Sequence, residues 1–91
     1  MSEREVFLVH FSTFISHDVV VGDFCEISTG VKLLGNTAVG NECSIGTNAV
    51  ILPGVKIGNN VVVGAGAVVT RNVSDNQTVV GVPAKPISKK Q

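Results

Sequence analysis

The feature that most constrains this chain is a six-residue repeat of branched apolar side chains. Every sixth residue of one long series is Val, Ile or Leu, without exception. A helix with 3.6 residues per turn would not keep this series on one face, and hairpins would need alternation with period two. The repeat therefore predicts a solenoid in which each hexad adds one short strand. The members are Val9, Ile15, Val21, Ile27, Leu33, Val39, Ile45, Ile51, Ile57, Val63 and Val69.

Two further series complete the hexad. Four positions after each member lies a second small or β-branched residue, which predicts a second inward-facing position. The residue just before it is Gly or Asn at seven of the eleven positions from Ser12 to Asn72, and these residue types tolerate positive φ. Each hexad is thus expected to be a short strand followed by a tight corner. The second series is Thr13, Val19, Cys25, Val31, Thr37, Cys43, Ala49, Val55, Val61, Ala67 and Val73.

An eighteen-residue period sets the number of hexads in a coil. Residues 21–25 (VGDFC) align with residues 39–43 (VGNEC). Three hexads per coil predict a triangular prism whose neighbouring coils pair as parallel strands. Residues 9–74 hold a little under four such coils. We therefore expect an all-β chain, with a parallel β-helix domain over residues 1–74 and a C-terminal loop and tail over residues 75–91.

Charge and composition limit the kinds of partner that the chain is expected to bind. The chain is 44% hydrophobic and 15% charged with a formal net charge of zero, so neither nucleic acid nor a membrane surface is an expected partner. No apolar run is long enough for a membrane span, and the N-terminus lacks a signal-peptide pattern, which favours a cytoplasmic protein. Cys25 and Cys43 fall in one inward column, one coil apart, where we expect reduced and inert thiols.

Several segments carry a resemblance to a known family. The segments are residues 16–24 (SHDVVVGDF), 27–30 (ISTG), 63–69 (VGAGAVV) and 80–85 (VGVPAK). Over residues 6–87 the chain resembles the hexapeptide-repeat acyltransferases, and in particular the sialic acid O-acetyltransferases and UDP-4-amino-sugar N-acetyltransferases. The resemblance implies a left-handed β-helix and transfer of an acetyl group from acetyl-CoA to a sugar or nucleotide-sugar acceptor. Members of that group also carry an N-terminal acceptor-binding domain, for which residues 1–8 leave no room.

The candidate catalytic residues are His17, Asp18 and Gly35. His17 lies at an expected corner, and the carboxylate of Asp18 could accept a hydrogen bond from one ring nitrogen and leave the other basic. The alternative is a solvated His-Asp pair at a surface turn. Gly35 follows His17 by eighteen residues, in the same corner column. The resemblance implies that its N–H holds the thioester oxygen, although it could equally serve only the turn. His10 has no counterpart and is expected to be packed or solvated.

The resemblance also implies residues for binding acetyl-CoA, the only expected cofactor, along a groove between two subunits. These are Glu26, Thr47, Ala65 and Lys85, of which Glu26 departs from the histidine that is common in the family. No metal is expected, because two histidines seven residues apart cannot supply a three-histidine site.

Apolar residues at outward positions predict self-association. A homotrimer would bury them and build sites between subunits. A non-catalytic β-helix scaffold that lacks the acceptor domain remains the alternative function. The outward positions are Phe14, Val20, Leu34, Val50, Leu52, Val62 and Val68.

Overall fold

A computed structural model describes residues 8–9 and 14–87 of the chain. The described residues form only strands and turns, as the hexad pattern predicts. The strands are β1 (Leu8–Val9), β2 (Phe14–Ile15), β3 (Val20–Val21), β4 (Glu26–Ile27), β5 (Lys32–Leu33), β6 (Ala38–Val39), β7 (Ser44–Ile45), β8 (Val50–Ile51), β9 (Lys56–Ile57), β10 (Val62–Val63), β11 (Val68–Val69), β12 (Thr78–Val80) and β13 (Lys85–Pro86).

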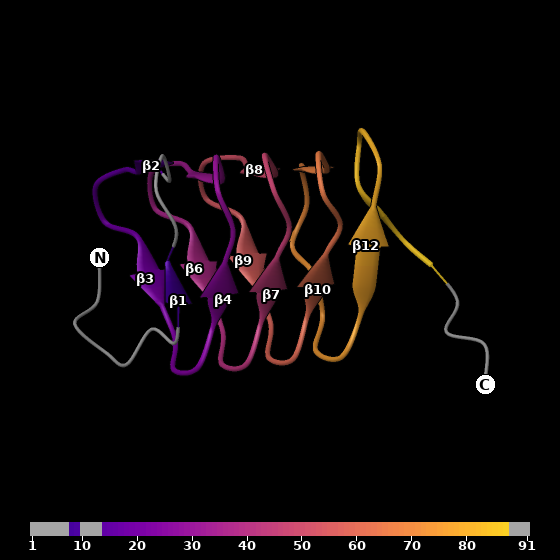
Figure 1. Ribbon diagram of the computed structural model, residues 1–91, viewed down its shortest axis with the longest axis horizontal. Coiled ribbons are helices and arrows are strands. Elements are labelled where there is room, and N and C mark those ends of the chain that lie inside the picture. The colour runs from indigo at the N-terminus through magenta and orange to yellow at the C-terminus, as the bar shows by residue number, and fades with distance from the viewer. Residues whose placement is uncertain (1–7, 10–13, 88–91) are drawn as a thin grey trace.

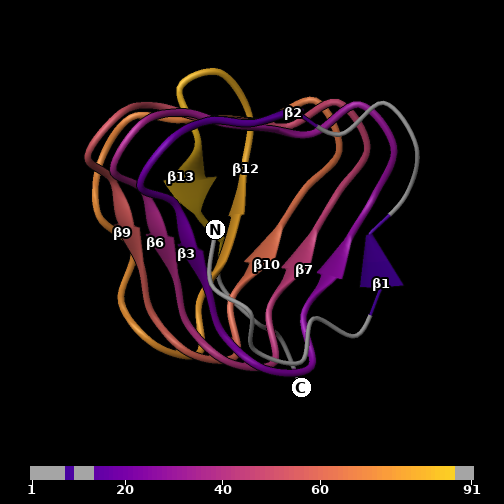
Figure 2. The same cartoon turned by 90° about the vertical axis from the view of Figure 1, so that its left-hand side faces the viewer.

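Three sheets form the sides of a triangular prism (Figure 1). Sheet 1 has the order β1-β4-β7-β10-β12-β13, sheet 2 the order β11-β8-β5-β2, and sheet 3 the order β3-β6-β9. Pairs between successive coils are parallel with an offset of eighteen residues, such as Val20 with Ala38. Seen from the N-terminal end in Figure 2, the chain runs anticlockwise from β1 through β2 and β3 to β4 as it recedes. The β-helix is therefore left-handed, which confirms the expected fold class.

The three sheets meet at three corners. The first corner joins sheet 2 to sheet 3 and contains residues 16–18, 34–36, 52–54 and 70–72. The second corner joins sheet 3 to sheet 1 and contains residues 22–24, 40–42, 58–60 and 74–76. The third corner joins sheet 1 to sheet 2 and contains residues 28–30, 46–48 and 64–66.

Each corner turns on one residue with positive φ, at the fourth place of the hexad. Non-glycine residues take this conformation at a steric cost, and Asn and Asp tolerate it best. The predicted turn residues adopt it in every hexad from the first described corner to Gly66, with φ between 57° and 79°. They are Asp18, Phe24, Gly30, Asn36, Glu42, Asn48, Gly54, Asn60 and Gly66.

The last coil departs from the eighteen-residue period. Val62 pairs with Thr78 and Ile57 bridges to Val73, each sixteen residues apart. Positive φ accordingly occurs at Asn76, and Asn72 does not share it. The side chain of Asn72 accepts a hydrogen bond from the Lys56 N–H at 2.9 Å instead. The expected turn at Asn72 is thus corrected: the shortened coil uses this residue to close the first corner against the coil before it.

The β-helix also continues beyond the expected domain boundary. β12 extends sheet 1 in parallel as far as Val80, so residue 74 falls inside the last coil. β13 then turns back and pairs antiparallel with β12, with Val80 opposite Lys85. This hairpin closes the C-terminal edge of sheet 1, and Pro86 on the outermost strand has no N–H with which to add another.

The core consists of the inward-facing repeat. Ile27, Leu33 and Ile51 are fully buried, and every residue of the second inward column from Val19 to Ala67 is buried as well. Cys25 and Cys43 are buried in the same interior as free thiols. Their sulfur atoms donate to the carbonyl oxygens of Gly40 and Gly58 at 3.0 and 3.1 Å. The neighbouring Cys25 side chain, and then burial, raise the pKa of the Cys43 thiol.

The outward apolar residues divide into two groups. Phe14, Val20 and Val62 are exposed, whereas the other expected outward positions are half-buried. Leu52 even packs against the core. The half-buried residues are Leu34, Val50, Leu52 and Val68. The surface left for a partner subunit is therefore smaller than the sequence pattern indicates.

Candidate active site

His17 and Asp18 form a pair at the first corner, in the first described coil. The Nδ1 atom of His17 lies 3.1 Å from Oδ2 of Asp18. The turn conformation of Asp18, with φ of 58°, brings its carboxylate back toward the preceding ring. Both side chains are about three-quarters exposed, at 75% and 74%. If the Nδ1 atom carries its hydrogen toward this carboxylate, Nε2 is the ring nitrogen left to accept a proton.

Gly35 lies directly over this ring, one coil later. A methyl group placed on its Cα would be 3.3 Å from both Cε1 and Nε2 of His17. The backbones of the two coils are joined here, since the Asn36 N–H donates to the His17 carbonyl oxygen at 3.3 Å. Any residue larger than Gly at this position would push the ring. The structure therefore brings His17, Asp18 and Gly35 together, as the eighteen-residue spacing predicts.

The second corner shows, by contrast, what is unusual about the first. There the third hexad position carries Asn or Asp, and each side chain accepts the N–H of the equivalent residue one coil earlier. The Asp23 N–H donates to Asn41, the Asn41 N–H to Asn59, and the Asn59 N–H to Asp75, each at 2.8 Å. These side chains form a ladder that satisfies the backbone of every turn.

The first corner has no such ladder. Its third positions are His17, Gly35, Pro53 and Arg71, and Pro53 has no side-chain oxygen to offer to Gly35. Among the described residues, none accepts a hydrogen bond from the Gly35 N–H. This donor therefore has no partner within the described part of the chain, and it belongs to the glycine that lies against the His17 ring. In the sequence, the second corner is recognised by Asn or Asp at its third hexad positions (residues 41, 59 and 75), which the first corner lacks.

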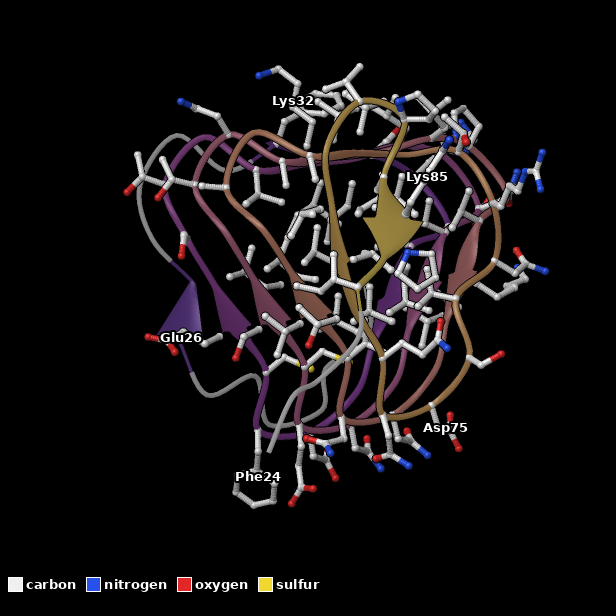
Figure 3. All side chains as sticks on the ribbon, turned by 90° about the vertical axis from the view of Figure 1, so that its right-hand side faces the viewer. Phe24, Glu26, Lys32, Asp75 and Lys85 are labelled. Carbon is white, nitrogen blue, oxygen red and sulfur yellow. The ribbon has the colours of Figure 1, made fainter. Side chains whose placement is uncertain are left out.

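The expected acetyl-CoA residues lie elsewhere on the same prism. Thr47 and Ala65 are exposed at the third corner, at the other end of sheet 2 from His17. Glu26 is exposed on β4, on the outer face of sheet 1 (Figure 3). The structure of one chain does not bring these residues to His17. The expected acetyl-CoA residues and the His17 corner therefore occupy different corners of one prism.

Lys85 is further away still, on β13 at the C-terminal end of the prism. It lines the rim of a cavity of about 630 Å³ between the last coil and the closing hairpin. Arg71 lines the same cavity, although no motif in the sequence singles it out. The cavity lies at the opposite end of the β-helix from the first coil, so it is separate from the His17 chemistry. Its remaining lining residues are Thr70, Asn72, Val73, Gln77, Val79, Pro83, Ala84 and Pro86.

His10, the other histidine of the chain, lies outside the described residues. Within the described ranges, His, Cys, Asp and Glu side chains form no group of three that could hold a metal ion. The same part of the chain contains no helix long and apolar enough to cross a membrane.

Comparison with known families agrees with the repeat. The family described as bacterial transferase hexapeptide (six repeats) matches residues 36–71. No curated protein matches the chain at the level of sequence.

Solved structures agree with the fold over most of the chain. WeeI from Acinetobacter baumannii AYE is 39% identical with a TM-score of 0.79, and the match covers 82% of this chain and 38% of WeeI. Serine acetyltransferase from Neisseria gonorrhoeae in complex with serine is 33% identical with a TM-score of 0.71, over 82% of this chain and 39% of that one. The acetyltransferase domain of PglB from Neisseria gonorrhoeae in complex with acetyl coenzyme A is 31% identical with a TM-score of 0.69, over 92% and 54%. The chain thus spans about two-fifths to about half of the length of these structures.

Proposed function

We propose that the chain takes part in acetyl transfer from acetyl-CoA to an amine or hydroxyl group, because residues 36–71 match the bacterial transferase hexapeptide family and the fold is similar to solved acetyltransferase structures. The observation that carries the proposal is the first corner, where Gly35 lies against the His17 ring, close to its Nε2 atom, and Asp18 lies beside the Nδ1 atom. The serine and acetyl-CoA complexes of similar structures support the reaction class.

In the proposed reaction, Nε2 of His17 takes the proton of the acceptor amine or hydroxyl as that group attacks the thioester carbonyl carbon. The Asp18 carboxylate stabilises the imidazolium that forms. The Gly35 N–H donates to the oxyanion of the tetrahedral intermediate. The C–S bond then breaks, and the imidazolium gives the proton that it took from the acceptor to the leaving thiolate of CoA. Transfer is direct, since Cys25 and Cys43 are buried and cannot carry an acyl group.

The donor site is proposed to form between copies of the chain. Thr47 and Ala65 of one copy would flank the acetyl and pantetheine end, and Glu26 would lie beside them. Lys85 would meet a phosphate of the nucleotide end. A homotrimer supplies three such sites, and this arrangement accounts for the separation of these residues from His17 on one prism. The proposed acceptor is a sugar or nucleotide-sugar.

The test has two stages. Calorimetry with acetyl-CoA asks whether the wild-type chain binds the donor, and a thiol-release assay with amino-sugar acceptors asks whether it transfers the acetyl group. His17→Ala should then lower kcat by about 10²–10⁴-fold while the Kd for acetyl-CoA stays unchanged, because the ring meets the acceptor proton. Asp18→Asn should cost less, since it only weakens the orientation of the ring.

His10→Ala is the matched control and should leave kcat unchanged. Equal activity of wild type and His17→Ala on an accepted substrate would reject the mechanism. If the chain binds acetyl-CoA but acetylates no acceptor, or does not bind it at all, the scaffold function replaces the proposed one.

A further inference from the structure

An aromatic ring and an ammonium group project side by side from the outer face of sheet 2. Phe14 on β2 and Lys32 on β5 are register partners in neighbouring coils, which places their Cα atoms about 4.8 Å apart. Both side chains are exposed, Phe14 at 53%. Figure 3 shows Lys32 pointing away from the prism. Neither residue contributes to the buried core.

This pair lies beside the catalytic corner in the same two coils. Phe14 precedes His17 by three residues, and Lys32 precedes Gly35 by three. Three extended residues span at most about 10 Å, so the aromatic ring and the ammonium group are both within reach of a molecule held at Nε2 of His17. Phe14 and Lys32 thus lie side by side on sheet 2. His17 and Gly35, the proposed base and oxyanion donor, lie side by side at the adjoining corner of the same two coils.

Among the described residues, neither side chain is held by an ion pair, a hydrogen bond or a ring contact of its own. Within the described part of the chain, no carboxylate pairs with the Lys32 ammonium. Lys56, the exposed lysine on sheet 3, differs because its Nζ donates to the Asn36 carbonyl oxygen at 3.1 Å. Phe14 differs likewise from Val50 and Val68 in the same column of sheet 2, which are half-buried and are separated from it by Lys32. The pair is therefore not a continuation of the apolar surface.

We propose that Phe14 and Lys32 select the acceptor of the reaction assigned above, and this inference rests on that proposed function. The ring of Phe14 stacks on a flat base or on the apolar face of a sugar, and the Lys32 ammonium binds a phosphate attached to it. The pair thus favours an acceptor that carries both a ring and a phosphate over a small free amine such as serine.

Steady-state kinetics on a uridine-diphosphate-linked 4-amino sugar test the pair. Phe14→Ala and Lys32→Gln should each raise the KM for this acceptor about tenfold, and kcat and the Kd for acetyl-CoA should stay unchanged. Phe14→Tyr and Lys32→Arg should restore most of the affinity. The loss in Lys32→Gln should shrink as salt is raised, because screening weakens the phosphate contact in the wild type.

Matched controls come from the same chain. Phe24→Ala removes an equally exposed ring, 56% against 53%, at the second corner, and Lys56→Gln removes a lysine on another sheet. Both should leave the KM unchanged. Sedimentation of each variant reports whether the oligomer persists.

The outcomes separate the two proposals. Suppose that wild type acetylates the phosphorylated acceptor and that the Phe14 and Lys32 variants have the same KM as wild type and the control variants. The selecting role is then overturned, and the proposed acetyl transfer remains. The same holds if wild type acetylates only free serine, or if Phe14→Ala dissociates the oligomer with loss of acetyl-CoA binding. A wild-type chain that acetylates nothing overturns both.

Discussion

At the scale of single residues, the third position of the hexad distinguishes the second corner from the first corner, which carries the proposed base. Asn41 and Asn59 use their side chains to satisfy the turn of the coil before them. Gly35 offers no side chain, so the His17 N–H has no ladder oxygen above it and the His17 ring has room to lie under the glycine. The same backbone shape thus yields either a turn whose N–H groups bond to a side-chain ladder or a turn without such acceptors, depending on one side chain per coil.

Two glycines at this corner should separate rate from stability. Gly35→Ala adds a methyl 3.3 Å from the His17 ring and should lower kcat about tenfold through displacement of Nε2, with little change in the free energy of unfolding. Gly54→Ala meets no atom within 4 Å but imposes a side chain at φ of +79°. It should lower the free energy of unfolding by about 1 kcal/mol and spare kcat. Kinetics and urea unfolding of both variants are the measurement, and a reversed pattern would refute this placement of the ring.

Thr37 gives a second prediction at this scale. Its side chain is buried at 1% exposure among valines, and no described residue bonds its hydroxyl group. Thr37→Val keeps the shape and removes the unpaired oxygen, so the free energy of unfolding should rise by about 1 kcal/mol. Val55→Thr, one coil later in the same column, should lower it by a similar amount. Urea midpoints of the two variants that move in the same direction would contradict the inward register.

At the scale of the elements, the corners hold strain that the strands offset. Phe24 and Glu42 occupy positions with φ of 59° and 60°, where Asn or Gly stands in most other coils. The coil keeps its shape because parallel pairing on both sides leaves the corner no other path. The strained residues are both at the second corner, whose backbone the side-chain ladder holds in place.

Relief of this strain should be measurable. Phe24→Asn should raise the free energy of unfolding by about 0.5–1 kcal/mol, because Asn adopts positive φ at lower cost. The opposite exchange, Asn48→Phe at φ of 61°, should lower it by a similar amount. Thermal or urea unfolding reports both. A stabilised Asn48→Phe variant would show that side-chain contacts, and not backbone conformation, decide the cost of a corner.

At the scale of the whole molecule, the first and third corners stand at opposite ends of sheet 2. One chain therefore presents a base without the proposed donor residues beside it. We expect sedimentation to give a particle of about three times the 9.4 kDa of one chain. A folded monomer would refute both the trimer and the shared site.

Complementation tests the sharing directly. His17→Ala disables the first corner, and Ala65→Trp should block the third. Each variant alone should be inactive. When the two are unfolded together and reassembled, about a quarter of the sites should pair an intact first corner with an intact third corner and regain activity. No recovery in mixed assemblies would place the whole site within one chain.

Much of the fold could be predicted because the repeat is local and redundant. Each hexad carries its own apolar positions and its own turn residue, so eleven copies of one pattern predict the strands, the eighteen-residue coil and the buried cysteines. The same spacing placed Gly35 over His17. The exception was the last coil, where the offset from the coil before it falls from eighteen to sixteen residues and Asn72 lacks the positive φ of the earlier turn residues. A prediction that extends one fixed period along the chain misses a coil that is two residues shorter than the others.

The sequence by itself determined the coil, its three sides and the column in which His17, Asp18 and Gly35 meet, because these follow from spacing along one regular path. Only the tertiary structure decided which outward apolar residues are covered, that the Gly35 N–H has no acceptor among the described residues, and that Phe14 and Lys32 are both exposed in the coils of His17 and Gly35. Burial and hydrogen bonding at these positions depend on which side chains of the adjacent coil lie against them. The place of a residue in its hexad does not specify those side chains.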